Sequence, residues 1–340
     1  MTIESSALEL EQLLSGKESV TIISHFNPDG DAAGSAVAMQ RFLQTREKHA
    51  QIVLPSRMPV YLDFLDPAKN IIYYTEDSVS AEKAISDSDM IVCLDFNKPD
   101  RTEWLKDPIA ASTACKVMID HHPHPVTDGF CLVISDPGAS STCELLYRVL
   151  ISFRSVSGNP MSVGQEALTA IATGILTDTN NFNNSITPYT FTTASGLLGA
   201  GVDFGFLNNM IFKRYSESRM RLMGHLLTDS MQIDRRTSSS CMLLTLDDKD
   251  RYNFQDGDSE GLVNLPLMIK DVEVSAMFSE TKDFVRVSLR SKGNVSVNAL
   301  ANRFFNGGGH ERAAGGRLFI PIAEVREYFR ESLEQFLQHA

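Results

Sequence analysis

Residues 115–122 read CKVMIDHH, an apolar run that ends in one aspartate and two histidines. Short continuous apolar runs of this kind are typical of strands buried in a parallel sheet. Further runs lie at residues 19–24, 50–55, 70–74 and 89–96, with helical or loop segments between them, such as the helical pattern over 31–44. This alternation predicts a parallel sheet covered by helices on both faces.

The pattern changes along the rest of the chain. Helical stretches occupy residues 140–153 and 162–176, and residues 187–231 show a continuously helical pattern. Beyond it we expect antiparallel strands with polar turns, a helix, a glycine-rich turn and a last helix. We therefore predict an α/β protein with an N-terminal domain over 1–190, a helical connector over 191–231 and a smaller α+β domain over 232–340.

Composition narrows the class of function. The net charge of −12 argues against non-specific binding of long nucleic acids, which relies on a broad basic surface. No apolar stretch reaches the about 20 residues that a membrane-spanning helix needs, and the N-terminus lacks the features of a secretory signal. Five cysteines without a C-x-x-C motif favour a reducing compartment. We expect a cytoplasmic protein that makes no membrane contact.

Acidic and histidine residues gather where the predicted elements end. Each cluster alone has an ordinary explanation as a turn, a helix cap or a solvated loop. Together they indicate more, because the carboxyl ends of parallel strands converge on one crevice. The set comprises His25, Asp29, Asp31, Asp95, Asp120, His121, His122 and Asp178.

Such a set of side chains predicts bound cations. Neighbouring carboxylates repel and raise one another's pKa, and divalent cations resolve that conflict. A site with several aspartates and one or two histidines suits Mn²⁺ or Mg²⁺ better than Zn²⁺. The carboxylates and imidazoles are too many for one ion. Two ions about 4 Å apart, bridged by shared carboxylates, fit the number of ligands and suit phosphoryl chemistry.

Four motifs in this chain resemble those of the DHH phosphoesterases: SHFNPDGDAAGS, VCLDFN, MIDHHPHP and GILTDTNNF. A fifth, NGGGHERAAGGRL, resembles the signature of their C-terminal companion, the DHHA1 domain. The resemblance covers nearly the whole chain, with the motifs in the expected order. Among family members, the length and layout are most similar to the nanoRNase and 3′-phosphoadenosine 5′-phosphate (pAp) phosphatase enzymes. The resemblance implies a catalytic DHH domain followed by a substrate-binding DHHA1 domain.

The resemblance also implies roles for individual residues. One Mn²⁺ would be held by His25, Asp29, Asp95 and Asp178, and the second by Asp31, Asp95, His121 and Asp178. A water between the ions would be the nucleophile. Asp120 would orient a metal-binding histidine, and His122 would face the scissile phosphate. His124 matches no motif position, and we interpret it as an incidental loop residue.

The glycine-rich segment over 306–316 is the second candidate site. Three successive glycines let backbone N–H groups approach an anion, and an adjacent histidine and arginine add charged donors. A plain glycine cap and loop is the alternative. The strand VRVSLRSKG carries alternating basic residues, for which an ordinary solvated face is the alternative. The predicted substrate contacts are Gly307, Gly308, Gly309, His310, Arg312 and Arg290.

The leading hypothesis is a phosphoesterase that acts on short single-stranded oligonucleotides from an end and on pAp. A cleft between the two domains would admit a few nucleotides but no duplex. A cyclic dinucleotide phosphodiesterase is the main alternative; the glycine-rich His motif argues against an inorganic pyrophosphatase. A non-catalytic nucleotide-binding module is the alternative from another class of protein. The sequence does not rank these substrates by preference. It does not determine the oligomeric state either, for which a homodimer is one option.

Overall fold

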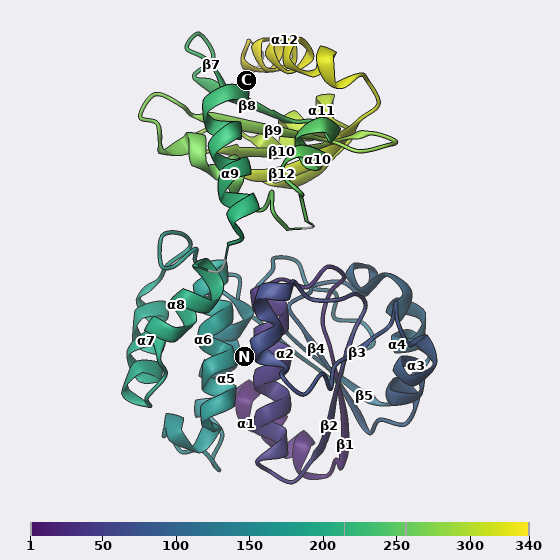
Figure 1. Ribbon diagram of the computed structural model, residues 1–340. Helices are drawn as coiled ribbons and strands as arrows, with labels where there is room; N and C mark the ends of the chain where they lie inside the picture. Colours follow the sequence, from purple (N-terminus) through teal and green to yellow (C-terminus); the bar gives the residue numbers. More distant parts are fainter. Residues whose placement is uncertain (1, 214, 256, 339–340) are drawn as a thin grey trace. The chain divides into compact units, whose positions relative to one another are not determined.

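The computed structural model of the chain describes residues 2–213, 215–255 and 257–338. The chain divides into two compact units, Met1–Arg214 and Tyr215–Ala340, and each is described by itself (Figure 1). The boundary between them falls inside the range 191–231 that the sequence predicts as a connector. Within the described part of the chain, no helix has both the length and the apolar composition needed to cross a membrane.

The first unit is built on a six-stranded parallel sheet with the order β3-β2-β1-β4-β5-β6, which confirms the predicted parallel sheet. β1 pairs in parallel with both β2 and β4, so the order of strands reverses between β1 and β4. Such a reversal opens a crevice at the carboxyl ends of the strands. The strands are β1 (Ser19–Ile23), β2 (His49–Leu54), β3 (Ile72–Tyr73), β4 (Met90–Leu94), β5 (Cys115–Asp120) and β6 (Leu132–Ser135).

Helices cover both faces of this sheet, as predicted and as Figure 1 shows. One core contains Phe42 of α2 and Ile171 of α6, and the other contains Ile85 of α3 and Ile109 of α4. The α-helices are α1 (Ile3–Ser15), α2 (Gly30–Gln44), α3 (Ser78–Ser86), α4 (Lys106–Ala111), α5 (Thr142–Ile151), α6 (Gln165–Asp178), α7 (Pro188–Gly199) and α8 (Phe204–Phe212). Shorter 3₁₀ segments are η1 (Val60–Leu65), η2 (Pro99–Leu105) and η3 (Pro160–Val163).

Two glycines bring α2 and α6 close together. A Cβ atom on Gly34 would lie 2.6 Å from the carbonyl oxygen of Ala170, and one on Gly174 would lie 2.7 Å from Oδ1 of Asp31. Such distances are shorter than real Cβ contacts, so only glycine fits at these positions. The close packing places the start of α2 beside the end of α6, and both helix ends carry predicted metal ligands.

The helical pattern over 187–231 is interrupted, contrary to the prediction of a continuous helical stretch. α7 ends before Gly201, whose φ of 87° favours glycine. Asp203 then caps α8, and Ser216 caps α9 (Glu217–His225), each accepting a hydrogen bond from a backbone N–H of its helix. Capping residues therefore divide this range into separate helices, although its apolar pattern alone does not mark the breaks.

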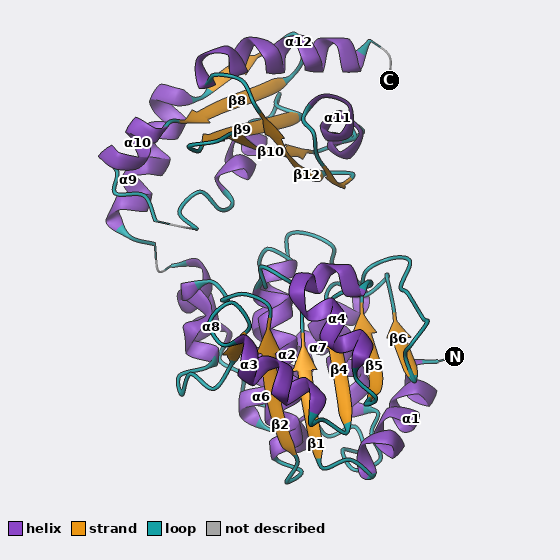
Figure 2. Ribbon diagram, turned by 90° about the vertical axis from the view of Figure 1, so that its right-hand side faces the viewer, coloured by secondary structure: helices purple, strands orange, loops and turns teal. Residues whose placement is uncertain are grey.

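The second unit contains a six-stranded sheet with the order β11-β12-β10-β9-β8-β7, of which Figure 2 labels β8, β9, β10 and β12. We expected antiparallel strands only, but β8 pairs with β9 in parallel. The reason is the intervening segment, where α10 and η5 return the chain so that β9 runs in the direction of β8. The strands are β7 (Gln232–Asp234), β8 (Ser239–Leu244), β9 (Val274–Glu280), β10 (Val285–Ser291), β11 (Gly308–His310) and β12 (Ala313–Leu318).

Helices also pack on both faces of the second sheet. Leu300 of α11 and Phe329 of α12 share one core with Phe278, whereas Leu222 of α9 shares another with Met277. Phe278 and Met277 are consecutive in β9, so their side chains point to opposite faces. The helical segments are α9, the π-helical η4 (Leu226–Ser230), α10 (Leu246–Arg251), η5 (Leu262–Met268), α11 (Val297–Phe304), η6 (Ile322–Glu324) and α12 (Val325–Leu337).

Candidate metal centre

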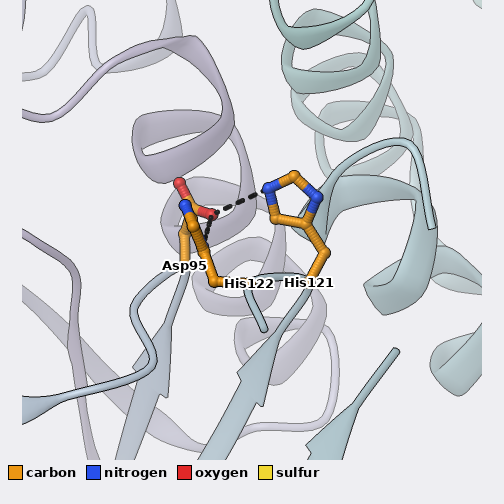
Figure 3. A group of neighbouring side chains, drawn as sticks. All are labelled: Asp95, His121 and His122. Atoms are coloured by element: carbon orange, nitrogen blue, oxygen red, sulfur yellow. Dashed lines mark ion pairs between the residues drawn. The ribbon is translucent and has the colours of Figure 1, made fainter. Parts of the chain in front are cut away.

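The carboxyl end of the parallel sheet collects the acidic and histidine residues of the four motifs. His25 follows β1 and Asp95 follows β4, the two neighbouring strands between which the strand order reverses. His121 and His122 follow β5, and Figure 3 shows their side chains beside that of Asp95. Three further aspartates lie at helix ends. Asp29 and Asp31 lie at the start of α2, and Asp178 is the last residue of α6.

The first group of donors consists of His25, Asp29 and Asp95, whose ligand atoms lie within 4.8 Å of one another. Nε2 of His25 is 3.4 Å from Oδ2 of Asp95. Nδ1 of His25 lies 2.9 Å from the carbonyl oxygen of Phe26. Because a carbonyl only accepts, Nδ1 carries a proton, and Nε2 faces the carboxylate of Asp95.

The second group consists of Asp31, His121 and Asp178, also within 4.8 Å. Nε2 of His121 lies 3.5 Å from Oδ2 of Asp178 and 3.9 Å from Oδ2 of Asp31. The same Nε2 is 3.7 Å from Oδ1 of Asp95, whose other oxygen faces His25. Asp95 therefore stands between the two groups. Asp178, which we expected to join both, lies with Asp31 and His121, and the charge of Asp29 in the first group also acts on it.

Electrostatics in this centre favour a bound cation. Burial, together with the charge of Asp95, raises the pKa of Asp31 to about 8. Burial, followed by the charge of Asp31, raises the pKa of Asp178 well above its ordinary value. Burial opposes ionisation of Asp95 as well, but its interaction with His25 and the charges of His121 and His122 together outweigh burial and lower its pKa to about 2. Divalent cations would balance these carboxylates, and an oxygen-rich set with histidine fits Mn²⁺ or Mg²⁺.

The start of α5 supports the centre, a role that our sequence analysis missed. The backbone N–H groups of Thr142 and Cys143 donate to Asp31 at 2.6 and 2.8 Å. The hydroxyl of Thr142 donates to Oδ1 of Asp95 at 2.9 Å. The sequence of this segment is typical of a helix cap, and Ser141 does cap α5 by accepting from the backbone N–H of Glu144. The additional signal in the sequence is a helix N-terminus, whose partial positive charge suits a carboxylate.

Asp120, which we expected to orient a metal-binding histidine, contacts His122, whose ligand atom lies within 4.8 Å of those of Asp95 and His121. Its Oδ1 lies 2.7 Å from Nδ1 of His122, while Nδ1 of His121 lies 3.4 Å from the carbonyl oxygen of Ala139. The reason is the period of an extended chain, in which residues i and i+2 point to the same side. Nη1 of Arg101, another residue that we had not singled out, lies 3.0 Å from Nε2 of His122.

The glycine-rich segment is a β-hairpin, and its glycines serve packing. A Cβ atom on Gly307 would lie 1.9 Å from the carbonyl oxygen of Gly315, and one on Gly309 would lie 2.5 Å from that of Ala313. The N–H of Gly309 donates to Oδ1 of Asn298 at 2.9 Å. The N–H of Gly307 donates to the carbonyl oxygen of Ala301. The amides of Gly307 and Gly309 therefore already have acceptors inside the domain.

Charged side chains remain the candidates for binding phosphate in the second unit. His310 pairs with Ala313 in the hairpin, and Ala313 pairs with Arg290 on the other side. Residues directly opposite each other in antiparallel strands share a face, so the side chains of His310 and Arg290 stand on one face of this sheet. Arg312 is exposed in the hairpin turn. Lys292 has a structural role, since its Nζ donates to carbonyl oxygens of residues 267, 269 and 270.

Comparisons with known proteins agree with this architecture. A bifunctional oligoribonuclease and PAP phosphatase of Thermus thermophilus is 30% identical over 99% of this chain and 96% of its own length. A cyclic-di-AMP phosphodiesterase of Listeria monocytogenes is 23% identical over 96% of this chain, which matches 49% of that protein. The crystal structure of an exopolyphosphatase-related protein from Bacteroides fragilis superimposes with a TM-score of 0.93 at 35% identity, covering 98% of this chain and 96% of that one.

Two family models match consecutive parts of the chain. The model of the DHH family, N-terminal domain, matches residues 19–175, which include five of the six residues in the two donor groups. The model of the DHHA1 domain matches residues 240–339, which include the glycine hairpin. Together with the relative from Thermus thermophilus, these matches show that the chain belongs to the DHH family and carries a DHHA1 domain.

Proposed function

We propose that this protein is a metal-dependent phosphoesterase that hydrolyses short single-stranded oligonucleotides and pAp. The observation that carries the proposal is the position of Asp95, whose two oxygens face two different groups of ligand atoms. A carboxylate shared in this way is what a pair of cations acting on one phosphate requires. Membership of the DHH family and the activities named for the Thermus thermophilus relative support the choice of substrates.

Two divalent cations, Mn²⁺ or Mg²⁺, would activate water and neutralise charge on the phosphate. In our assignment His25 and Asp29 would hold one cation and Asp31, His121 and Asp178 would hold the other, while Asp95 would contribute to both. The amides at the start of α5 fix Asp31 before any cation binds. The ligands are therefore preorganised, which reduces the cost of assembling the centre.

We assign His122 to the scissile phosphate. Asp120 holds Nδ1 of this ring, and Nε2 lies on the side of Arg101. Arg101 lies against the same Nε2, so its guanidinium is placed to bind a phosphate oxygen that approaches His122. Asp120 itself is fully buried and acts through His122 without touching the substrate.

The DHHA1 domain would bind the rest of the substrate. Arg290, His310 and Arg312 supply donors for a second phosphate. Gly307, Gly308 and Gly309 would contribute by allowing the hairpin to bring His310 into position. We propose residues 1–190 as the catalytic domain, 191–231 as the connector and 232–340 as the substrate-binding domain.

Hydrolysis of cyclic dinucleotides is the second candidate function. The cyclic-di-AMP phosphodiesterase from Listeria monocytogenes aligns with 96% of this chain, so both domains of this chain have counterparts in it. The chain matches 49% of that relative's length. Linear and cyclic substrates present the same phosphodiester to the metal centre, so the choice between them depends on the groups that surround it.

A substrate panel tests the proposed function. With Mn²⁺ present, we expect turnover of oligonucleotides of two to a few residues and of pAp, with lower kcat/KM for longer strands. Cyclic di-AMP and inorganic pyrophosphate complete the panel. Preference for cyclic di-AMP would favour the second candidate, and the absence of turnover on every phosphate ester would contradict both.

A further inference from the structure

An aromatic cluster with a half-exposed ring lies in the first unit. Trp104, the chain's single tryptophan, is 50% exposed. Its ring stacks with that of Tyr74 at a centroid distance of 6.1 Å and an interplanar angle of 10°. It meets the ring of Phe26 edge-on at 5.5 Å. The three rings come from separate segments, namely the turn after β1, the residue after β3, and η2.

Short stretches of backbone join this cluster to the metal centre. Phe26 directly follows His25, so their Cα atoms are about 3.8 Å apart. Trp104 lies three positions after Arg101, which limits their Cα separation to about 11 Å. The N–H of Phe26 donates to the carbonyl oxygen of Arg101 at 2.8 Å, and the side chain of Arg101 reaches His122. The cluster is therefore adjacent to the groups that we assign to cations and phosphate.

The backbone of η2 holds Trp104 outward. Thr102 and Leu105 on either side of it are fully buried and anchor the segment. Between them, Glu103 adopts a φ of 49° and a ψ of −115°, a conformation that is unfavourable for a residue with a side chain. Strain of this kind is retained where the surrounding structure imposes it, and it is concentrated at functional sites. An aromatic ring needed only for packing would gain more by pointing inward.

We propose that the exposed part of Trp104, supported by Tyr74 and Phe26, is a stacking site for one nucleobase of the substrate. The proposal rests on the proposed function and adds a recognition site to the metal centre. Every base has a π-face, so an aromatic ring binds it with little sequence preference. In a chain with a net charge of −12, such an uncharged contact provides affinity that general electrostatic attraction does not.

The first test compares three dinucleotides: pApA and two analogues that lack either the first or the second base. Trp104→Ala should lower kcat/KM for pApA by about 5- to 150-fold, mainly through KM, whereas Trp104→Phe keeps an aromatic face and should retain most of the activity. One of the two analogues should be insensitive to Trp104→Ala, because it lacks the base that stacks.

Phe206 provides a matched control for these kinetics. It is an exposed ring on α8 with an edge-on partner, Phe64, and it belongs to no element of the metal centre. Phe206→Ala should leave kcat/KM unchanged for all three dinucleotides. Unchanged kcat/KM for pApA in Trp104→Ala, or equal losses on all three dinucleotides, would overturn the stacking site.

Fluorescence gives a readout that is independent of turnover. Because Trp104 is the single tryptophan, the tryptophan emission of the protein reports on this position alone. In the Mn²⁺-loaded enzyme, adenosine 5′-monophosphate should change the emission, and ribose 5-phosphate, which lacks the base, should not. Constant emission at nucleotide concentrations that inhibit hydrolysis, or the same response to both compounds, would contradict the proposal.

The outcomes separate this proposal from the proposed function. If the wild-type enzyme and the Trp104→Ala variant cleave pApA equally well, the stacking proposal is wrong and the proposed function still stands. A wild-type enzyme that cleaves neither oligonucleotides nor pAp contradicts both.

Discussion

The two units place their candidate functional side chains in opposite environments. In the first, His25 is 5% exposed and Asp31 is fully buried, and protein hydrogen bonds hold both. In the second, His310 and Arg312 are exposed on a hairpin whose glycines serve packing. Buried ionised groups need a compensating partner, whereas exposed groups are already solvated. We therefore expect substitutions in the first unit to affect metal binding and kcat, and substitutions in the second to affect affinity for the substrate.

The largest effect is expected at Asp95. Asp95→Asn removes a negative charge from between the two groups, and kcat should fall more than about 100-fold on every substrate, beyond the range for a residue that only supports a ligand. Steady-state kinetics and metal content measure the effect. Asp89→Asn is the control, since Asp89 precedes the other end of β4 and accepts from the N–H groups of Glu18 and Ser19. Near-normal turnover in Asp95→Asn would contradict the expectation that substitutions in the first unit affect metal binding and kcat.

Arg290→Ala and His310→Ala should weaken binding of nucleotide substrates while the metal content stays unchanged. Loss of one charge-assisted hydrogen bond costs about 1.5–3 kcal/mol, which corresponds to about a 10- to 150-fold higher KM. Arg286→Ala is the matched control, because Arg286 lies on the same strand at the end away from the hairpin turn, opposite Arg317. Unchanged kinetics in both variants would contradict the proposal that the second unit binds the substrate through Arg290 and His310.

Asp120→Asn distinguishes, within the first unit, a residue that positions His122 from the residues that hold the cations. The variant keeps the shape of the side chain but weakens its hold on His122, so kcat should fall by about 10- to 100-fold with both cations still bound. Metal content measured beside kcat separates this result from that of Asp95→Asn. Loss of a cation in Asp120→Asn would show that Asp120 acts on the ligands themselves.

The metal-free protein should lose stability as the pH rises from about 4 through about 8. In this range the folded state binds more protons than the unfolded state, because the pKa of Asp31 is raised from 3.8 to about 8. The pKa of His121 is also raised, since its attraction to Asp31 and Asp95 outweighs burial. Stability linked to His121 is likewise present below its ordinary pKa of 6.5 and lost at higher pH. Asp95, with a pKa of about 2, acts below this range.

Thermal unfolding between pH 5 and pH 8.5 tests this dependence. Tm of the metal-free protein should fall by roughly 5–10 °C across the range, given about 2–4 °C for each kcal/mol. With Mn²⁺ the fall should disappear, because the ions bind ionised carboxylates and neutral histidines. A metal-free Tm that rises with pH would contradict the electrostatic account of the first unit.

The sequence predicts the parts of the centre that depend on local pattern. Apolar runs identify β1, β4 and β5, and parallel pairing brings their carboxyl ends together, so His25, Asp95 and His121 could be expected to meet. The support of Asp31 by Thr142 could not be predicted in the same way. The two residues are 111 positions apart in the sequence. The start of α5 reads as an ordinary cap until the tertiary structure places it against α2.

The glycine segment shows the opposite limitation. Consecutive glycines are compatible with an anion cradle and with close packing of a hairpin, and local sequence does not separate the two. The structure decides for packing at Gly307 and Gly309, because a Cβ atom at either would meet a backbone oxygen. The parallel pairing of β8 with β9 was equally out of reach, since it depends on the path of the segment between them.

Binding of Mn²⁺ to the metal-free protein tests the central claim most directly, because it needs no substrate. Titration followed by calorimetry and electron paramagnetic resonance should give two ions per chain, magnetically coupled through their shared ligand Asp95. Asp178→Asn, which alters the second group, should retain the ion of the first group. A wild-type chain that binds a single Mn²⁺, or two ions without coupling, would contradict a centre in which one carboxylate joins two cations.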